Sequence, residues 1–129
     1  MNFMSHHCRS AVLSCIDFRF QEAINKFILE HNLNGNTDRI GLAGGVKKLG
    51  EMFEELSISE DLHQVDDMYL INHQDCGAYG PAVAQDQQQE LKTHTRDLLT
   101  AKKLINEKYP QVNVYTYFLT LEKEFIEIN

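Results

Sequence analysis

The sequence has few cysteines and prolines, and it has no tryptophan and no long apolar run. Three cysteines and two prolines occur among 129 residues. Three cysteines are too few and too odd in number for a disulfide framework, so we expect a reducing compartment, the cytoplasm. No stretch approaches the ~20 apolar residues of a membrane span, and the N-terminus lacks the apolar core of a secretory signal. We therefore expect no membrane partner.

Positive charge is also scarce. Lysine and arginine together number 12 against 19 acidic residues, which gives a net charge of −7 at pH 7. This balance argues against nucleic acid or an anionic membrane as a partner. With 43% hydrophobic and 24% charged residues, the chain can build one core. Its length predicts one domain over residues 1–129.

Apolar periodicity alternates between two and 3.6 residues along the chain, which predicts strands that alternate with helices. Helices are expected after Phe20, around Leu49 and from Leu91 to before Pro110, where Leu91, Leu98 and Ile105 repeat every seven residues. The expected strands cover residues 10–16, 37–43, 68–72, 112–119 and 125–128. This order predicts an α/β fold: a mostly parallel central sheet of four strands, a C-terminal antiparallel edge strand, and helices on the faces.

Polar segments follow the first three strands, at the edge where ligands gather in α/β sheets. In the first segment, Cys15, Asp17 and Arg19 are two residues apart, so they point to one side if strand geometry continues. Asp17 and Arg19 can pair there. The alternative is a buried structural cysteine beside a surface ion pair.

A histidine and a cysteine follow the third strand in the spacing H-x-x-C. His73 and Cys76 can turn toward one point in a tight loop. Zinc takes nitrogen and sulfur ligands, and three protein ligands leave a fourth position for water or substrate. Together with Cys15 from the first strand, the pair predicts a zinc site. The alternative is Cys76 as a histidine-activated nucleophile without metal, which would not need a second cysteine.

Two glycines, Gly44 and Gly45, lead from the second strand into a helix. The segment LAGG lacks both common phosphate-loop motifs, so nucleotide binding has little support. The glycines would let the backbone approach a small ligand or offer N–H groups to an anion. A plain strand-to-helix turn is the alternative.

The segments CIDFR, LAGG and HQDCG together resemble the motifs of the β-class carbonic anhydrases. That family has C-x-D-x-R after its first strand, A-G-G or A-G-N after its second and H-x-x-C-G after its third. The same motifs stand here in the same order, and the resemblance extends from about Ser10 to the C-terminal hairpin. It implies the fold of that family and bound Zn²⁺.

The resemblance also implies a role for each motif residue. Cys15, His73 and Cys76 resemble the zinc ligands, and Asp17 resembles the residue that is a fourth ligand in a closed state. In an open state Asp17 pairs with Arg19, and zinc-bound hydroxide attacks carbon dioxide to give bicarbonate. The implied assembly is a homodimer or a larger homo-oligomer. The implied substrate-binding residues are Gly44, Gly45 and Gly77.

The sequence also departs from the family. Gly41 and Leu42 stand where the family often has Arg-Asn, and Phe18 stands where a small serine is common. No counterpart of a substrate-binding glutamine is evident, and we expect no N-terminal helical arm because the first strand begins by residue 10. Apolar Leu42 and Phe18 favour an alternative zinc hydrolase of carbonyl sulfide or carbon disulfide. A non-catalytic zinc-binding or regulatory homologue is the other alternative.

Several further polar and aromatic residues are assigned no function. We expect three of the histidines to be solvated and Asp75 to have no catalytic role. Tyr79 is expected to pack or to line the mouth of the pocket. Two tyrosines of the fourth strand are expected to pack or to lie at a subunit interface. The N-terminal tract His6-His7-Cys8 is interpreted as incidental. The histidines are His31, His63 and His94, and the strand tyrosines are Tyr115 and Tyr117.

Overall fold

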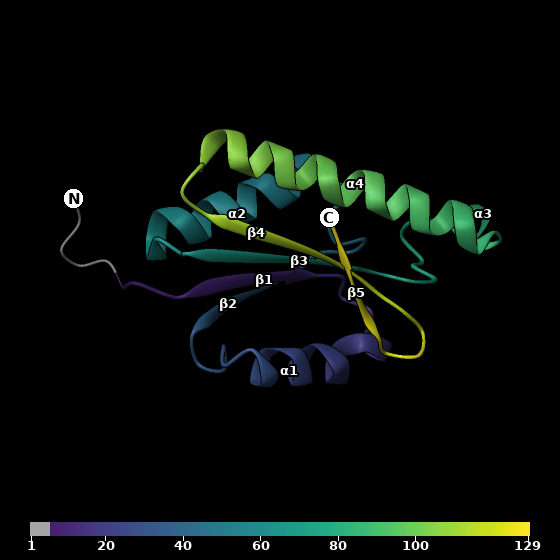
Figure 1. Ribbon diagram of the computed structural model, residues 1–129, viewed down its shortest axis with the longest axis horizontal. Coiled ribbons are helices and arrows are strands. Elements are labelled where there is room, and N and C mark those ends of the chain that lie inside the picture. Colours follow the sequence, from purple (N-terminus) through teal and green to yellow (C-terminus); the bar gives the residue numbers. More distant parts are fainter. Residues whose placement is uncertain (1–5) are drawn as a thin grey trace.

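The computed structural model describes residues 6–129. These residues contain one five-stranded sheet, in the order β2-β1-β3-β4-β5 (Figure 1). β1 pairs in parallel with β2 and β3, β3 pairs in parallel with β4, and β5 is antiparallel to β4. The predicted α/β fold, mostly parallel with an antiparallel edge strand, is confirmed. The strands are β1 (Ser10–Ser14), β2 (Thr37–Gly41), β3 (Asp67–His73), β4 (Asn113–Leu119) and β5 (Phe125–Ile128).

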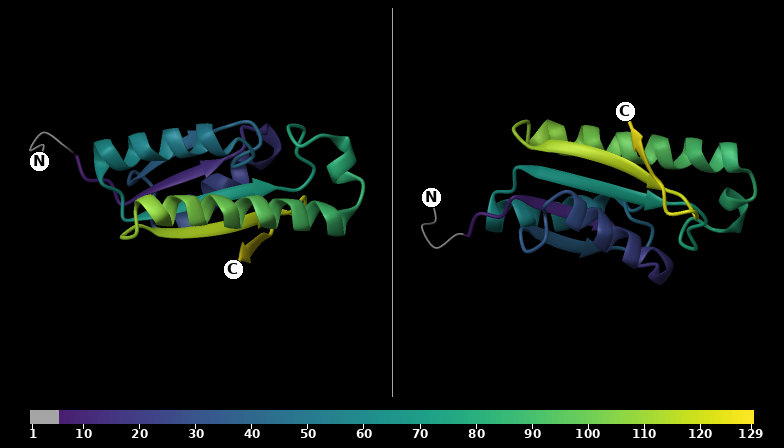
Figure 2. Two further views of the ribbon diagram at one scale, coloured as in Figure 1. Left: turned by 90° about the horizontal axis from the view of Figure 1, so that it is seen from above. Right: turned by 60° about the horizontal axis from the view of Figure 1, so that its bottom comes forward.

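Helices cover both faces of the sheet. α1 lies on one face, and α2 and α4 lie on the other (Figures 1 and 2). Two apolar clusters result, one between the sheet and α1 and the other between the sheet and the α2–α4 layer. The helical segments are the 3₁₀ turn η1 (Phe18–Phe20), α1 (Gln21–Glu30), α2 (Leu49–His63), α3 (Pro81–Ala84) and α4 (Gln87–Lys108).

The first two strands end two residues earlier than the sequence predicts. β1 ends at Ser14 and β2 ends at Gly41, so the motif residues that follow lie in loops at the carboxyl edge of the sheet. The polar run 85–89 begins a helix, because the Asp86 side chain accepts hydrogen bonds from the backbone N–H groups of Gln88 and Gln89. The short helix α3 is not predicted by the periodicity.

The inward face of α4 differs from the predicted heptad. A heptad of this kind places Leu91, Leu98 and Ile105 on one buried face. Leu98 and Ile105 are buried, but Leu91 is 37% exposed, so the heptad is wrong at Leu91. The prediction of a solvated His94 is also wrong, because this side chain is fully buried. The face that meets the sheet runs through Glu90, His94, Leu98, Ala101 and Ile105, and its spacing of three and four residues excludes Leu91.

The tyrosines of β4 pack within the molecule. Tyr115 stacks on Tyr69 with ring centroids 5.1 Å apart, and Tyr117 meets the edge of Phe27 from α1 at 5.2 Å. Packing therefore accounts for both side chains. Within residues 6–129, no helix combines the length and the apolar character that crossing a bilayer requires.

Candidate metal centre

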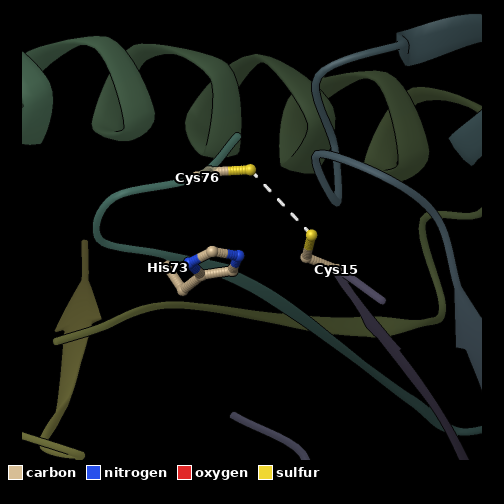
Figure 3. Close-up of side chains that lie close together, drawn as sticks. All are labelled: Cys15, His73 and Cys76. Atoms are coloured by element: carbon tan, nitrogen blue, oxygen red, sulfur yellow. Dashed lines mark hydrogen bonds between the residues drawn. The ribbon is translucent and has the colours of Figure 1, made fainter. Parts of the chain in front are cut away.

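Two cysteines and a histidine meet at the carboxyl edge of the sheet, where β1 and β3 end side by side. The ligand atoms of Cys15, His73 and Cys76 lie within 4.8 Å of one another, and all three residues are buried. The two Sγ atoms are 3.9 Å apart, and the imidazole points toward them (Figure 3). The convergence that parallel pairing predicts for these residues is present.

The imidazole of His73 is oriented by the loop that follows it. Its Nδ1 lies 2.7 Å from the Gln74 carbonyl oxygen, which only accepts, so Nδ1 carries the proton. The ring stacks on Phe20 with centroids 4.2 Å apart. Nε2 is buried and has no hydrogen-bond partner among residues 6–129. In the neutral ring, Nε2 therefore presents a free lone pair on the side of the two sulfurs.

Cys15 is the thiol that ionises more readily. A hydrogen bond from Cys76, opposed by burial, lowers the pKa of Cys15, and the Gly44 N–H adds a hydrogen bond to Cys15 Sγ at 3.3 Å. The same thiol–thiol bond and burial raise the pKa of Cys76. Burial lowers the pKa of His73, but the neighbouring Cys15 raises it overall. A buried imidazole nitrogen whose lone pair has no hydrogen-bond partner lies beside two sulfurs. This set of ligand atoms fits Zn²⁺, which binds nitrogen and sulfur ligands in a tetrahedron.

A carboxylate held by an arginine lies beside the cluster. Asp17 accepts a hydrogen bond from the Arg19 backbone N–H at 2.9 Å and from its guanidinium Nη2 at 2.7 Å. The strand has ended by this point, so the 3₁₀ turn, and not strand alternation, brings the two together. Asp17 Oδ2 lies 3.8 Å from His73 Nε2. Hydrogen bonding to Arg19, opposed by burial, lowers the pKa of Asp17 to about 2.

Asp75, between the two ligands of the H-x-x-C loop, is also tied to Arg19. The guanidinium donates to Asp75 Oδ2 at 3.1 Å and to its carbonyl oxygen at 2.8 Å. Hydrogen bonds to Asp17 and to Asp75 raise the pKa of Arg19. Arg19 therefore links the loop after β1 to the loop after β3.

Two supporting residues were not identified from the sequence. Gln21 Nε2 donates to the carbonyl oxygens of Cys15 at 3.1 Å and of Asp17 at 2.9 Å. Glu90 is 2% exposed, and its carboxylate accepts the Asp75 N–H at 2.7 Å. The sequence carries no signal for Glu90, because the packing of α4 on the sheet decides which face of the helix is buried.

The three glycines occupy different places. Gly77 lines an open hollow of about 630 Å³ beside Cys15 and Asp17. Gly44 and Gly45 are buried, and the Gly44 N–H is directed at Cys15 Sγ. Substrate binding by these glycines stays a prediction. The lining of the hollow combines the charged residues Asp17 and Arg19 with apolar side chains, of which Ile16 is 63% exposed and Phe18 is 85% exposed.

The residues that were assigned no function lie outside the cluster. His7 contacts Asp66 at the surface, 3.3 Å away, and His31 is exposed as expected. His63 is only partly solvated, because its Nδ1 lies 2.6 Å from Asp38 Oδ2. Burial, together with the nearby His73, lowers the pKa of His94 to about 4.

Comparison with known proteins identifies the family of this chain. Residues 5–129 match the protein family described as "Putative carbonic anhydrase". An uncharacterized protein of Rickettsia bellii (strain RML369-C) is 31% identical, over 86% of this chain and 76% of that protein. An uncharacterized protein of Rickettsia conorii (strain ATCC VR-613 / Malish 7) is 30% identical, over 86% of this chain and 67% of that protein.

Solved structures show the same fold. The carbonic anhydrase of Streptococcus mutans superposes with a TM-score of 0.68 at 16% identity, over 97% of this chain and 84% of that chain. A β-carbonic anhydrase of Trichomonas vaginalis gives 0.61 at 12% identity, over 97% and 84%. With a family match over nearly its whole length and this fold, the chain belongs to the carbonic anhydrase family.

Proposed function

We propose that this protein catalyses the zinc-dependent reversible hydration of carbon dioxide to bicarbonate. Membership of the carbonic anhydrase family supports the reaction. The observation that carries the proposal is the free, buried Nε2 of His73, which faces two sulfurs beside a carboxylate. Such a group of donors is costly in a protein core unless a cation binds to it.

Cys15, His73 and Cys76 would hold the metal. Zinc at such a site supplies a Lewis acid that lowers the pKa of water toward ~7. The Gln74 carbonyl fixes the His73 tautomer, and the Gly44 N–H stabilises negative charge on Cys15 Sγ. Such outer contacts orient ligands and tune their basicity.

Asp17 and Arg19 are the proposed catalytic residues. With a pKa of about 2, Asp17 is ionised at neutral pH and can accept a hydrogen bond from a water or hydroxyl beside His73. Arg19 holds the carboxylate in that orientation through the 2.7 Å bond. If Asp17 left Arg19, its carboxylate could act as the fourth ligand of a closed state. Hydration releases one proton, and the open hollow at Asp17 and Gly77 gives it a path to solvent.

The test is a stopped-flow assay of carbon dioxide hydration, with metal content measured on the same sample. We expect about one zinc per chain and a hydration rate well above that of buffer. A rate equal to buffer with zinc bound would reject catalysis and favour a non-catalytic metal-binding protein. Protein that does not bind zinc would reject the ligand set.

The apolar part of the lining of the hollow supports a second candidate reaction. Phe18 lines the hollow together with Ile16 and Ala43, although Leu42 does not, and none of these three side chains has a hydrogen-bond donor. A site of this kind would also suit the hydrolysis of carbonyl sulfide or carbon disulfide. Assays of carbon dioxide, carbonyl sulfide and carbon disulfide on one zinc-loaded preparation discriminate between the two reactions, because the physiological substrate should give the highest kcat/KM.

We also propose a cytoplasmic homodimer or larger homo-oligomer. The three cysteines are free, and two of them would need to remain reduced to bind metal. Exposed Ile16 and Phe18 are apolar surface that a second copy could cover. Sedimentation equilibrium tests the assembly, and a monomer at micromolar concentration would overturn it.

A further inference from the structure

One buried amide lies directly behind the metal centre. Asn72, next to His73 in β3, is 1% exposed and forms hydrogen bonds with three other segments. Its Oδ1 accepts the Val46 N–H at 3.1 Å, and its Nδ2 lies 2.9 Å from both Tyr79 Oη and His94 Nδ1. All of these contacts are internal, so the amide is satisfied without water.

The direction of every bond in this network follows from the donors. A backbone N–H can only donate, so Oδ1 of Asn72 faces Val46, and Nδ2 donates to the other two partners. His94 Nδ1 therefore accepts, and Tyr79, having accepted from Asn72, donates its own proton to Asp97 Oδ2 at 2.8 Å. Aspartate or leucine at position 72 could not make the same set of bonds.

The partners of Asn72 belong to the loops that carry the metal-binding atoms. Val46 is two residues after Gly44, whose N–H donates to Cys15 Sγ. Tyr79 is three residues after Cys76, and its N–H donates to the Cys76 carbonyl oxygen at 3.1 Å. One side chain thus connects the loop that contacts the first sulfur, the loop that carries the second sulfur, and the strand that carries the histidine.

We propose that Asn72 is a positioning residue that sets the separation of the two sulfurs for the metal by locking these two loops together. The inference rests on the proposed zinc site, and it assigns no contact between Asn72 and metal or substrate. It explains a local feature of the LAGG segment. Gly45 lies so close to Asn72 that a Cβ there would meet Oδ1 at 2.3 Å, so the close approach of the loop to the amide requires a glycine.

The test uses Co²⁺ as the metal, because the visible absorption of cobalt reports both binding and ligand geometry. We compare the wild type with Asn72→Leu, which has a similar volume but no hydrogen bonds. Residues that support metal ligands typically contribute 10–100-fold to metal affinity, so we expect the Co²⁺ dissociation constant to rise about 10–100-fold. We also expect the absorption bands of the saturated protein to shift.

Thr116→Val is the matched control. Thr116 is 1% exposed and donates a buried hydrogen bond to the Ile128 carbonyl oxygen at 2.6 Å, in β4 and away from the cluster. This variant should lose stability but keep the cobalt affinity and spectrum of the wild type. Tyr79→Phe keeps the ring but removes the hydroxyl that accepts from Asn72 and donates to Asp97, and it should weaken Co²⁺ binding about tenfold, the lower end of the range for such supporting residues.

The outcomes separate this inference from the proposed function. If the wild type binds one Co²⁺ and Asn72→Leu keeps the same affinity and spectrum, the role of Asn72 is overturned and the metal site stands. If Asn72→Leu does not fold, Tyr79→Phe decides, and a wild-type affinity and spectrum in that variant overturn the inference. If the wild type binds no Co²⁺, the proposed metal site fails, and the inference fails with it.

Discussion

Gly45 and Asn72 are in direct contact at the edge of the sheet, and the Cβ of an alanine at Gly45 would lie 2.3 Å from Asn72 Oδ1. Asn72 cannot easily move away, because it is buried and hydrogen-bonded to three partners. The backbone of Gly45 is also left-handed, with φ of 60°. We therefore expect Gly45→Ala to lower the free energy of unfolding by about 2–5 kcal/mol, as measured by urea denaturation.

Gly35 provides the matched control for this prediction. Its φ is 75°, and an added Cβ would meet nothing within 4 Å. Gly35→Ala should therefore show only the backbone cost, about 1–2 kcal/mol. The excess cost at Gly45 should shrink when Asn72 is also changed to alanine. Equal costs at the two glycines would show that the overlap with Asn72 is unimportant.

The second prediction concerns the ligand set. Cys76→Ser replaces a sulfur that lies 3.9 Å from Cys15 Sγ with a poorer zinc ligand, so zinc content should fall sharply. Elemental analysis after dialysis measures it. Cys8→Ser is the control, because the Cys8 thiol is outside the cluster and donates to the Ser10 carbonyl oxygen. Unchanged stoichiometry in Cys76→Ser would remove Cys76 from the proposed ligands.

A third prediction follows from the ion pair of Asp17 with Arg19. The pKa of Asp17 is lowered from 3.8 to about 2, so the pair stabilises the folded state fully above pH 4 and loses this effect as pH falls toward 2. In metal-free protein, Asp17→Asn should cost about 1 kcal/mol at pH 6, after allowance for solvent screening at the exposed Arg19. The cost should shrink at pH 3.

Urea denaturation at the two pH values measures this difference. Arg19→Gln should remove the same pH-dependent part of the stability, because it removes the cation that lowers the pKa of Asp17. A cost for Asp17→Asn that is the same at pH 6 and at pH 3 would contradict the assignment.

The sheet and the convergence of Cys15, His73 and Cys76 could be predicted from the sequence for one physical reason. Apolar periodicity located the strands, and parallel neighbours end at the same edge, so Cys15 and His73 had to lie close together. The pairing of Asp17 with Arg19 was predicted as well, although it arises from a 3₁₀ turn that the periodicity did not indicate. Apolar periodicity, parallel pairing of strands and the spacing of the motif residues were together sufficient for these features.

The supporting contacts behind the cluster could not be predicted in the same way. Glu90 and His94 are polar, so a search for apolar repeats passed over them and favoured Leu91. Their burial depends on partners from other elements, Asp75 for the carboxylate and Asn72 for the imidazole. The distances to these partners are set by how α4 packs on the sheet, and single-helix periodicity does not contain that information.

The fourth prediction tests which face of α4 meets the sheet. Leu98 is fully buried, so Leu98→Ala should lower the free energy of unfolding by about 2–5 kcal/mol. Leu91 is 37% exposed, and Leu91→Ala should cost less than about 1 kcal/mol. Urea denaturation of the two variants measures the difference. Similar costs for both would favour the heptad and contradict the observed face.

The last prediction concerns Glu90, whose carboxylate holds the loop between His73 and Cys76. Glu90 accepts the N–H of Asp75, whose backbone is left-handed with φ of 57°. Glu90→Leu removes the charged acceptor of this part-buried hydrogen bond, at a cost of about 1–3 kcal/mol, so the loop between His73 and Cys76 should open more often. Glu90→Gln retains a carbonyl oxygen that can accept the same bond, so this variant should lose much less stability.

Amide hydrogen exchange measured by NMR distinguishes the two variants. In Glu90→Leu the Asp75 amide should exchange about tenfold faster or more, since each ~1.4 kcal/mol corresponds to a factor of ten. The amide of Leu42, which donates to the Ser14 carbonyl oxygen after β2, is the internal reference and should keep its rate. If both amides accelerate equally, the substitution has lowered global stability, and Glu90 has no particular role in holding the loop.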